Sequence, residues 1–151
     1  MKRLVAMAVA LLLAVPAAAQ VRVIDGDTLD VHGVKTRLWG IDAPEGKQSC
    51  QRDDVAWLCG QEAAKALREL VVGKEVACRE VDRDRYKRSV AVCRAGDTDV
   101  NDWMAREGWA LDYRQFSKGE YAGAEKEARE AKRGLWAGTF IPPWEWRRGK
   151  R

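Results

Sequence analysis

The stretch VRVIDGDTLDV, residues 21–31, carries the first clear pattern in the chain. Residues 21–24 and 28–31 are typical of β-strands, and Asp25-Gly26-Asp27 interrupts them. His32-Gly33 then indicates a turn. Residues 34–38 return as a further strand, in which apolar and charged side chains alternate. We therefore expect short consecutive strands at this end of the chain.

Downstream of these strands, the sequence changes to helical spacing and then back to strand. The predicted elements are a helix over 61–72, strands over 75–81 and 89–93 around a polar turn at 82–88, and helices over 101–107 and 121–133. This order is not a regular β–α alternation, so we expect an α+β domain with an antiparallel sheet. The tail over 142–151 is basic, and we expect it to be irregular.

The first nineteen residues have the three-part composition of a secretory signal peptide. Residues 1–3 include two basic side chains, residues 4–15 are uncharged and apolar, and residues 17–19 are alanines. The apolar run is shorter than the roughly 20 residues that span a bilayer. A buried first strand and a membrane anchor are the alternatives. We predict a signal peptide over 1–19, one domain over 20–151, and export to the periplasm or the medium without a membrane anchor.

Composition excludes several kinds of chemistry. The chain has 27 Lys and Arg, 23 Asp and Glu, and one His, with a net charge of +4. A single His cannot form a two-histidine zinc site or acid–base pair, and glycine-rich phosphate and dinucleotide motifs do not occur. None of the serines lies in a nucleophile elbow. What remains is chemistry built from carboxylates, arginines and a hard metal ion.

The four cysteines are Cys50, Cys59, Cys78 and Cys93. An even number in an exported chain favours disulfides, and without a C-x-x-C pair a zinc site has little support. Three connectivities are possible. We favour Cys50–Cys59, which closes a short loop, and Cys78–Cys93, which would join two strands of a hairpin.

Carboxylates form two of the three charged clusters that could carry chemistry. Asp25 and Asp27 would face the same way in an extended strand and could share Ca²⁺ or Mg²⁺. Asp42 and Glu45 lie in a loop that contains a proline, directly after the strand that carries Arg37. An Arg at such a position can hold a phosphate through two hydrogen bonds. An ordinary Asp-Gly-Asp turn and a surface salt bridge are the alternatives.

The third cluster is Asp84-Arg85-Tyr86-Lys87-Arg88, which places three cations and a tyrosine on one turn. Such a turn could contact a phosphate and a base, although it could also be a solvated hairpin tip. Two tryptophans of the tail, Trp144 and Trp146, could stack on bases or dock the tail on the domain.

Together, the three clusters resemble the staphylococcal nuclease family in their order and spacing. The resemblance rests on residues 23–28, 37–45, 84–88, 100–110 and 134–136, and it covers essentially the whole chain after the predicted signal. It implies a five-stranded OB-fold β-barrel with three α-helices, a fold that binds oligonucleotides on one face.

The resemblance also implies a metal site. Asp27 and Asp42 would be the carboxylate ligands of Ca²⁺, with the backbone carbonyl of Ala43 as a further oxygen ligand. Asp25 would be a nearby acid behind these ligands. Oxygen ligands of this kind suit a hard divalent cation.

Three further residues receive catalytic roles from the resemblance. Glu45 would activate or orient the attacking water, and Arg37 and Arg88 would hold the scissile phosphate. Positively charged donors offset the charge that develops on the phosphate oxygens during attack. A carboxylate within hydrogen-bond reach of a water can supply the nucleophile.

Substrate contacts are implied at the basic turn and at one tyrosine further along the chain. Arg85, Tyr86, Lys87 and Tyr113 would contact nucleic acid, and Phe116 takes the place of another aromatic residue of the family. The family usually has Gly where this chain has Lys87. A more basic turn would bind phosphate more strongly, or the turn would change its geometry.

The sequence therefore predicts an exported, monomeric, Ca²⁺-dependent nuclease that hydrolyses DNA and RNA with little sequence preference. A non-catalytic OB-fold nucleic-acid-binding protein is the alternative. The presence of both metal-binding acids, the water-activating Glu45 and the two phosphate-binding arginines favours the enzyme.

Overall fold

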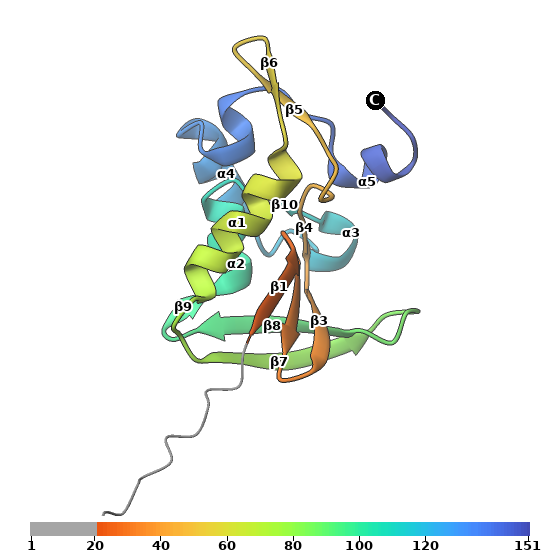
Figure 1. Ribbon diagram of the computed structural model, residues 1–151, viewed down its shortest axis with the longest axis vertical. Coiled ribbons are helices and arrows are strands. Elements are labelled where there is room, and N and C mark those ends of the chain that lie inside the picture. The colour runs from red at the N-terminus through yellow and green to blue at the C-terminus, as the bar shows by residue number, and fades with distance from the viewer. Residues whose placement is uncertain (1–20) are drawn as a thin grey trace, which may run out of the picture.

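A computed structural model describes residues 21–151, so the predicted signal peptide lies outside the described residues. The described chain is an α+β fold, as the sequence predicts, in which helices stack on one side of a strongly twisted sheet (Figure 1). Within residues 21–151, no helix is long and apolar enough to cross a membrane.

The main sheet has six strands, five of them in the hydrogen-bonded order β1-β2-β3-β8-β7, with β9 paired to β8. Their bounds are β1 Arg22–Asp25, β2 Thr28–Val31, β3 Val34–Leu38, β7 Val76–Arg83, β8 Ser89–Ala95 and β9 Thr98–Asp99. In the described chain, the ladder ends at β1 and β7, and the closed barrel stays a prediction.

The expectation of a purely antiparallel sheet is wrong at one position. Strands β3 and β8 pair in parallel, with Arg37 opposite Val90. A parallel pair needs a long crossover connection. The chain provides it between residues 38 and 89, which include helix α1, Cys59–Val71, and strand β7. The sheet is therefore mixed.

Three helices correspond to the predicted ones. They are α1, α2 (Val100–Arg106) and α4 (Ala122–Glu130), and their apolar sides face the main core. Helix α2 begins at Asp99, whose carboxylate accepts a hydrogen bond from the backbone N–H of Asp102 at 2.9 Å. The fully buried Asn101 donates to the carbonyls of Trp39 and Ala91. These bonds fix α2 against β8 and against the turn that leads to residues 41–46, which we call the acidic loop.

Several short elements were not predicted. They are β4 (Ile41–Asp42), β5 (Cys50–Arg52), β6 (Val55–Trp57), β10 (Leu111–Asp112), helices α3 (Arg114–Ser117) and α5 (Pro143–Arg147), and the 3₁₀ helix η1 (Gly134–Ala137). The expectation of an irregular tail is wrong at α5. Pro143 lies at the start of this helix, where the missing N–H of proline costs nothing.

Both predicted disulfides are present. Cys50–Cys59 links the hairpin β5–β6 to the first residue of α1. Cys78–Cys93 joins residues that lie directly opposite each other on β7 and β8. A smaller apolar cluster surrounds the first disulfide, and Trp144 of α5 packs against it. The tail is therefore docked on the domain.

Candidate active site

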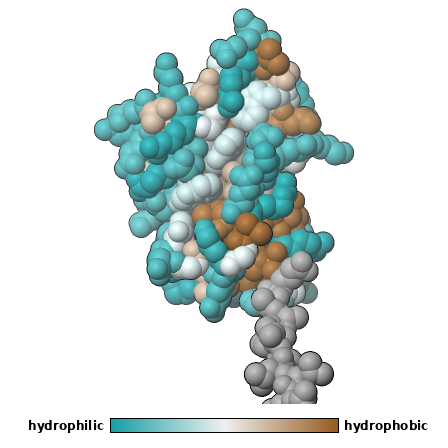
Figure 2. Space-filling model, turned by 60° about the vertical axis from the view of Figure 1, so that its left-hand side comes forward, coloured by the Kyte–Doolittle hydropathy of each residue, from teal (hydrophilic) through white to brown (hydrophobic). Residues whose placement is uncertain are grey.

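Two hollows differ in their chemistry. The larger, about 880 Å³, lies between β1 and the end of α1 and is lined by five valines and by charged side chains of both signs. Figure 2 shows a patch of hydrophobic residues on the face of the domain next to the point where the grey trace meets it. The smaller, about 610 Å³, is lined by carboxylates, arginines and aromatic rings. Convergent polar groups mark a functional site better than size does, so the smaller cleft is the candidate.

The cleft contains most of the predicted site residues. Those that line it are Asp25, Asp27, Arg37, Ala43, Glu45, Arg85, Tyr86, Arg88, Tyr113 and Phe116. Asp42 lies behind its wall with no exposed surface. Lys87 is outside the lining. One residue of the tail, Arg147, also lines the cleft.

The first acidic residues are brought close by the turn between β1 and β2. The backbone N–H of Asp27 donates to the Asp25 carboxylate at 3.1 Å. Gly26 lies so near the acidic loop that a Cβ there would be 2.8 Å from the Cβ of Ala43. Burial, and after it the charge of Asp27, raises the pKa of Asp25 to about 6.

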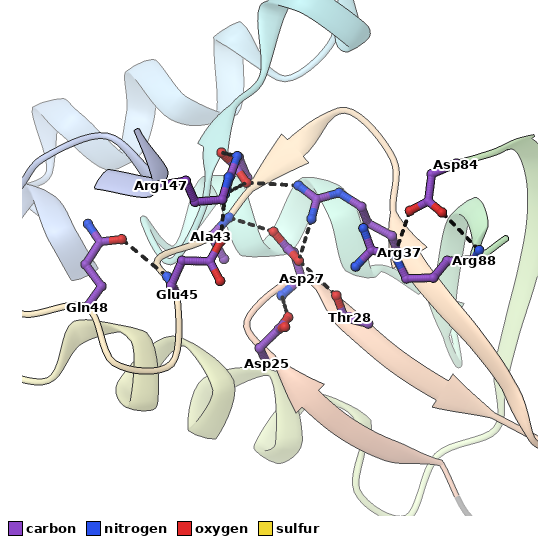
Figure 3. Close-up of polar contacts among 11 residues, drawn as sticks. Asp25, Asp27, Thr28, Arg37, Ala43, Glu45, Gln48, Asp84, Arg88 and Arg147 are labelled. Carbon is purple, nitrogen blue, oxygen red and sulfur yellow. Dashed lines mark hydrogen bonds and ion pairs between the residues drawn. The ribbon is translucent and has the colours of Figure 1, made fainter. Parts of the chain in front are cut away.

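Asp27 joins three parts of the chain. Its carboxylate accepts hydrogen bonds from the backbone N–H of Ala43 at 3.0 Å and from Thr28 at 3.1 Å. It also forms an ion pair with Arg37 at 3.3 Å. Because the side chain is almost fully buried, these partners hold it in one orientation (Figure 3).

Asp42 is placed by strand β4, which pairs with β10 so that Asp42 lies opposite Leu111. Its Oδ1 accepts from Arg37 at 2.9 Å and from Arg147 at 3.0 Å. Its Oδ2 accepts from Arg147 at 2.8 Å. Burial raises the pKa of Asp42 above its usual value, although both arginines act in the opposite direction.

Glu45 lies in the loop after β4, and the loop is fixed from behind. The backbone N–H of Glu45 donates to the side-chain oxygen of Gln48 at 3.3 Å. Gln48 is fully buried and donates in turn to the carbonyl of Ile141 at 2.7 Å. The carboxylate of Glu45 accepts from Arg147 at 2.8 Å. We call Asp27, Asp42 and Glu45 the acid cluster.

Arg37 connects the acid cluster to the cleft. Burial acts to lower its pKa, but Asp27 and Asp42 outweigh this effect and leave it above the usual value. Its guanidinium group has five N–H donors, of which one bonds to each aspartate. In the part of the chain that the structure describes, the remaining donors have no partner, so they are free to bind an anion.

A second wall of the cleft is formed by Asp84, Arg85, Tyr86 and Arg88, and we call residues 84–88 the basic tip. Asp84 accepts from the backbone N–H groups of Tyr86 and Arg88 at 2.9 and 3.0 Å and from the side chain of Arg88 at 2.6 Å. Burial acts to raise the pKa of Asp84, but these bonds lower it overall. Arg85 and Arg88 both lie over the exposed ring of Tyr86.

Lys87 is placed at the turn with φ of +62°, a conformation that favours glycine. The turn geometry that a glycine would provide is therefore kept by a lysine. Lys87 does not line the cleft, so its predicted contact with nucleic acid would be made at the rim.

Aromatic side chains close one end of the cleft. Tyr113 is stacked on Trp144 with the ring centres 5.3 Å apart and the planes 8° apart. Phe116 meets Tyr113 edge-on at 4.9 Å. One face of Tyr113, the residue predicted to contact a nucleotide, is therefore covered by the tail.

The donor chemistry fits a hard cation. Both aspartates accept hydrogen bonds from Arg37, and the backbone N–H of Ala43 donates to Asp27, so the two carboxylates and the backbone of Ala43 are held close together. Among residues 21–151, no group of three or more His, Cys, Asp or Glu side chains is placed to bind a metal. Any cation here would complete its shell with backbone oxygen and water, as Ca²⁺ and Mg²⁺ do.

Sequence reasoning missed Gln48 and Arg147. A glutamine between a Pro-containing loop and a cysteine carries no motif. Arg147 lies among basic residues of the tail, and the only signal was Pro142-Pro143, which marks a helix start. The local sequence around either residue could not indicate its partner, which lies more than 90 positions away in the chain.

Comparison with known proteins gives consistent matches. Residues 35–138 match the family model described as staphylococcal nuclease homologue. The chain is 39% identical to an uncharacterized endonuclease of Escherichia coli O157:H7, over 86% of this chain and 84% of that protein. It is 37% identical to a micrococcal nuclease of Shigella flexneri, over 99% and 93%.

A third relative has a different kind of name. The chain is 40% identical to the succinoglycan biosynthesis protein ExoI of Rhizobium meliloti strain 1021, over 80% of this chain. It spans 65% of the length of that relative.

Proposed function

Because the chain belongs to the staphylococcal nuclease family and is a phosphodiester hydrolase, we propose that it is a Ca²⁺-dependent nuclease of DNA and RNA. We also propose that it cleaves with little sequence preference. The observation that carries this proposal is one cleft that is lined by Asp27 and Glu45 together with Arg37 and Arg88, with Asp42 bound to Arg37 behind its wall. Phosphodiester hydrolysis needs a negative group that activates water and positive groups that hold the phosphate.

The proposed metal ligands are Asp27, Asp42 and the carbonyl oxygen of Ala43, with Asp25 behind them. Their burial and the hydrogen bond that joins Ala43 to Asp27 support this assignment, because they hold the oxygen donors of two chain segments together. Bound there, Ca²⁺ would supply positive charge for the phosphate and a ligand position for water. The family is generally Ca²⁺-dependent, which agrees with an oxygen-only donor set.

Arg37 and Arg88 are proposed to hold the scissile phosphate. Both line the cleft, and both keep N–H donors beyond those used by their aspartates. Each aspartate also restricts the rotamers of its arginine, so less conformational entropy is lost when the phosphate binds. Lys could not replace either residue fully, because it lacks the planar fork.

Glu45 is proposed as the residue that orients the attacking water and accepts its proton. It lines the cleft, its side chain is 35% exposed, and Gln48 fixes its backbone. A partly exposed carboxylate on a fixed loop can reach a water without losing its position.

The rim of the cleft is proposed to bind the rest of the nucleic acid. Arg85, Tyr86 and Lys87 offer charge and an aromatic face on the basic tip, and Tyr113 offers the edge that Trp144 leaves open. Stacking and charge together bind single strands with little sequence preference.

Export as a monomer is proposed as well. Two disulfides suit the periplasm or the medium, because reducing compartments rarely allow them to persist. A protein without a signal peptide would remain in the cell, so the signal over 1–19 is part of this proposal, as is the domain over 20–151.

The test is hydrolysis of heat-denatured DNA, and of RNA in parallel, by the purified protein with its disulfides intact. We expect cleavage in millimolar Ca²⁺ and none with excess chelator. Tight binding without cleavage in any divalent ion would instead support the non-catalytic binding protein. Cleavage that survives the chelator would contradict the proposed metal site.

A further inference from the structure

The C-terminal helix sends one side chain into the acid cluster. Arg147 donates two hydrogen bonds to Asp42, at 2.8 and 3.0 Å, and one to Glu45 at 2.8 Å (Figure 3). A guanidinium bound to both oxygens of a carboxylate is among the strongest pairings that side chains make. Arg147 is thus held by the acids to which the proposed function assigns metal binding and water activation.

These bonds use most of the binding capacity of Asp42. Its Oδ1 accepts from Arg37 and Arg147, and its Oδ2 accepts from Arg147. Each carboxylate oxygen has two lone pairs, so one lone pair of the four is left. Asp42 has no exposed surface, whereas the side chain of Arg147 is 35% exposed and lines the cleft. A cation that approaches Asp42 from the cleft therefore meets Arg147.

The helix that carries Arg147 is anchored on both sides of the acidic loop. Gln48 binds the carbonyl of Ile141, Pro143 is buried, and Trp144 stacks on Tyr113. These contacts keep the guanidinium near the acids even when its own bonds are broken. A tethered group of this kind acts at a high effective concentration.

We propose that Arg147 competes with Ca²⁺ for Asp42, so that α5 sets the Ca²⁺ concentration at which the site loads. This inference rests on the proposed function, because it takes Asp42 as a Ca²⁺ ligand. Two effects act in the same direction: Arg147 occupies the oxygens, and its positive charge repels a second cation within a few ångströms.

Arg148 provides a matched control. It is the next residue of the chain, carries the same charge and is exposed, and none of its side-chain contacts within residues 21–151 reaches the acid cluster. A change at Arg148 removes one charge from the tail without freeing Asp42.

The test is the Ca²⁺ dissociation constant of the whole protein, measured by titration calorimetry without nucleic acid. We expect Arg147→Gln to bind Ca²⁺ about tenfold more tightly than the unchanged protein, a typical coupling between two ligands. Arg148→Gln should change the constant less than about twofold, because a solvated charge is screened. Circular dichroism checks that each variant is folded.

Arg147→Lys is the second variant, and it keeps the proposal falsifiable if Arg147→Gln does not fold. Lysine keeps the charge but loses the fork, so we expect Ca²⁺ binding about threefold tighter than in the unchanged protein. Ca²⁺ binding that is unchanged or weaker in the folded Arg147 variants would overturn the proposal.

A third measurement tests whether Arg147 contacts the phosphate of the substrate and does not compete with Ca²⁺. Binding of an uncleavable oligonucleotide that falls in Arg147→Gln but not in Arg148→Gln, with an unchanged Ca²⁺ constant, would also overturn the proposal. If no Ca²⁺ binds to any form, including the unchanged protein, both this inference and the proposed metal fail. If the unchanged protein cleaves with Ca²⁺ but the Arg147 variants have the same Ca²⁺ dissociation constant as that protein, this inference alone fails.

Discussion

The acid cluster and the basic tip both contribute residues to one cleft, but they are built differently. Asp42 is fully buried and pairs with Arg147, 105 positions away. Asp84 pairs with Arg88, four positions away, on a turn whose Tyr86 is 66% exposed. The acid cluster thus depends on the packing of the whole domain, whereas one turn is enough to form the basic tip. Changes that leave the buried aspartates of the first unpaired should affect stability and activity together, whereas changes at the partly exposed Glu45 and in the second should affect stability little.

Glu45→Gln should give the largest loss of activity. The amide keeps the shape of the side chain but cannot accept the proton of water, so cleavage of denatured DNA should fall about a thousandfold. Stability should change little, because the side chain is partly exposed. Glu69→Gln on the surface of α1 is the control and should leave the rate unchanged. A Glu45 variant that retains a tenth of the activity would contradict the assigned role.

Arg37→Gln tests whether the acid cluster couples stability to activity. The rate should fall about a hundredfold or more, because a phosphate donor is lost. The free energy of unfolding should also fall by about 3 kcal/mol, because buried Asp27 and Asp42 lose a shared partner. Urea denaturation and initial rates measure the two effects.

Arg88→Gln is the matched change on the other wall. Its rate should fall by a similar factor of about a hundred. Its free energy of unfolding should change by less than about 1 kcal/mol, because the ion pair with Asp84 is local and partly exposed. Equal losses of stability in the Arg37 and Arg88 variants would show that the two walls do not differ as described.

Lys87→Gly should have the smallest effect. Glycine removes the cost of the positive φ but adds freedom to the unfolded chain, so the free energy of unfolding should rise by about 0.5 kcal/mol. The rate should fall less than about threefold, since Lys87 does not line the cleft. A larger loss of rate would show that Lys87 acts at the scissile phosphate and not only at the rim.

Much of the fold could be predicted because its signals are local. Helical spacing of apolar residues located α1, α2 and α4, and strand patterns located β1, β2, β3, β7 and β8. The opposition of Cys78 and Cys93 followed from a hairpin centred on the polar turn. These signals lie within a few residues of the structure they specify.

The missed elements are short and are stabilised from outside. Helix α5 has five residues, too few to be stable alone, and it is held by Trp144 and by the Gln48–Ile141 hydrogen bond. The parallel pairing of β3 with β8 depends on how the intervening chain crosses over. The local propensities of these segments predict neither the docking of α5 nor the parallel pairing of β3 with β8.

The charged residues of the candidate site, the order of the main elements and the resemblance to a nuclease family could all be predicted from the amino-acid sequence. The pairing of those charges depends on how distant segments pack. Asp42 receives Arg147 because α5 docks on Tyr113 and Ile141 is held by Gln48. Contacts across so many residues carry a large loop-closure entropy, which only the burial of the common core offsets.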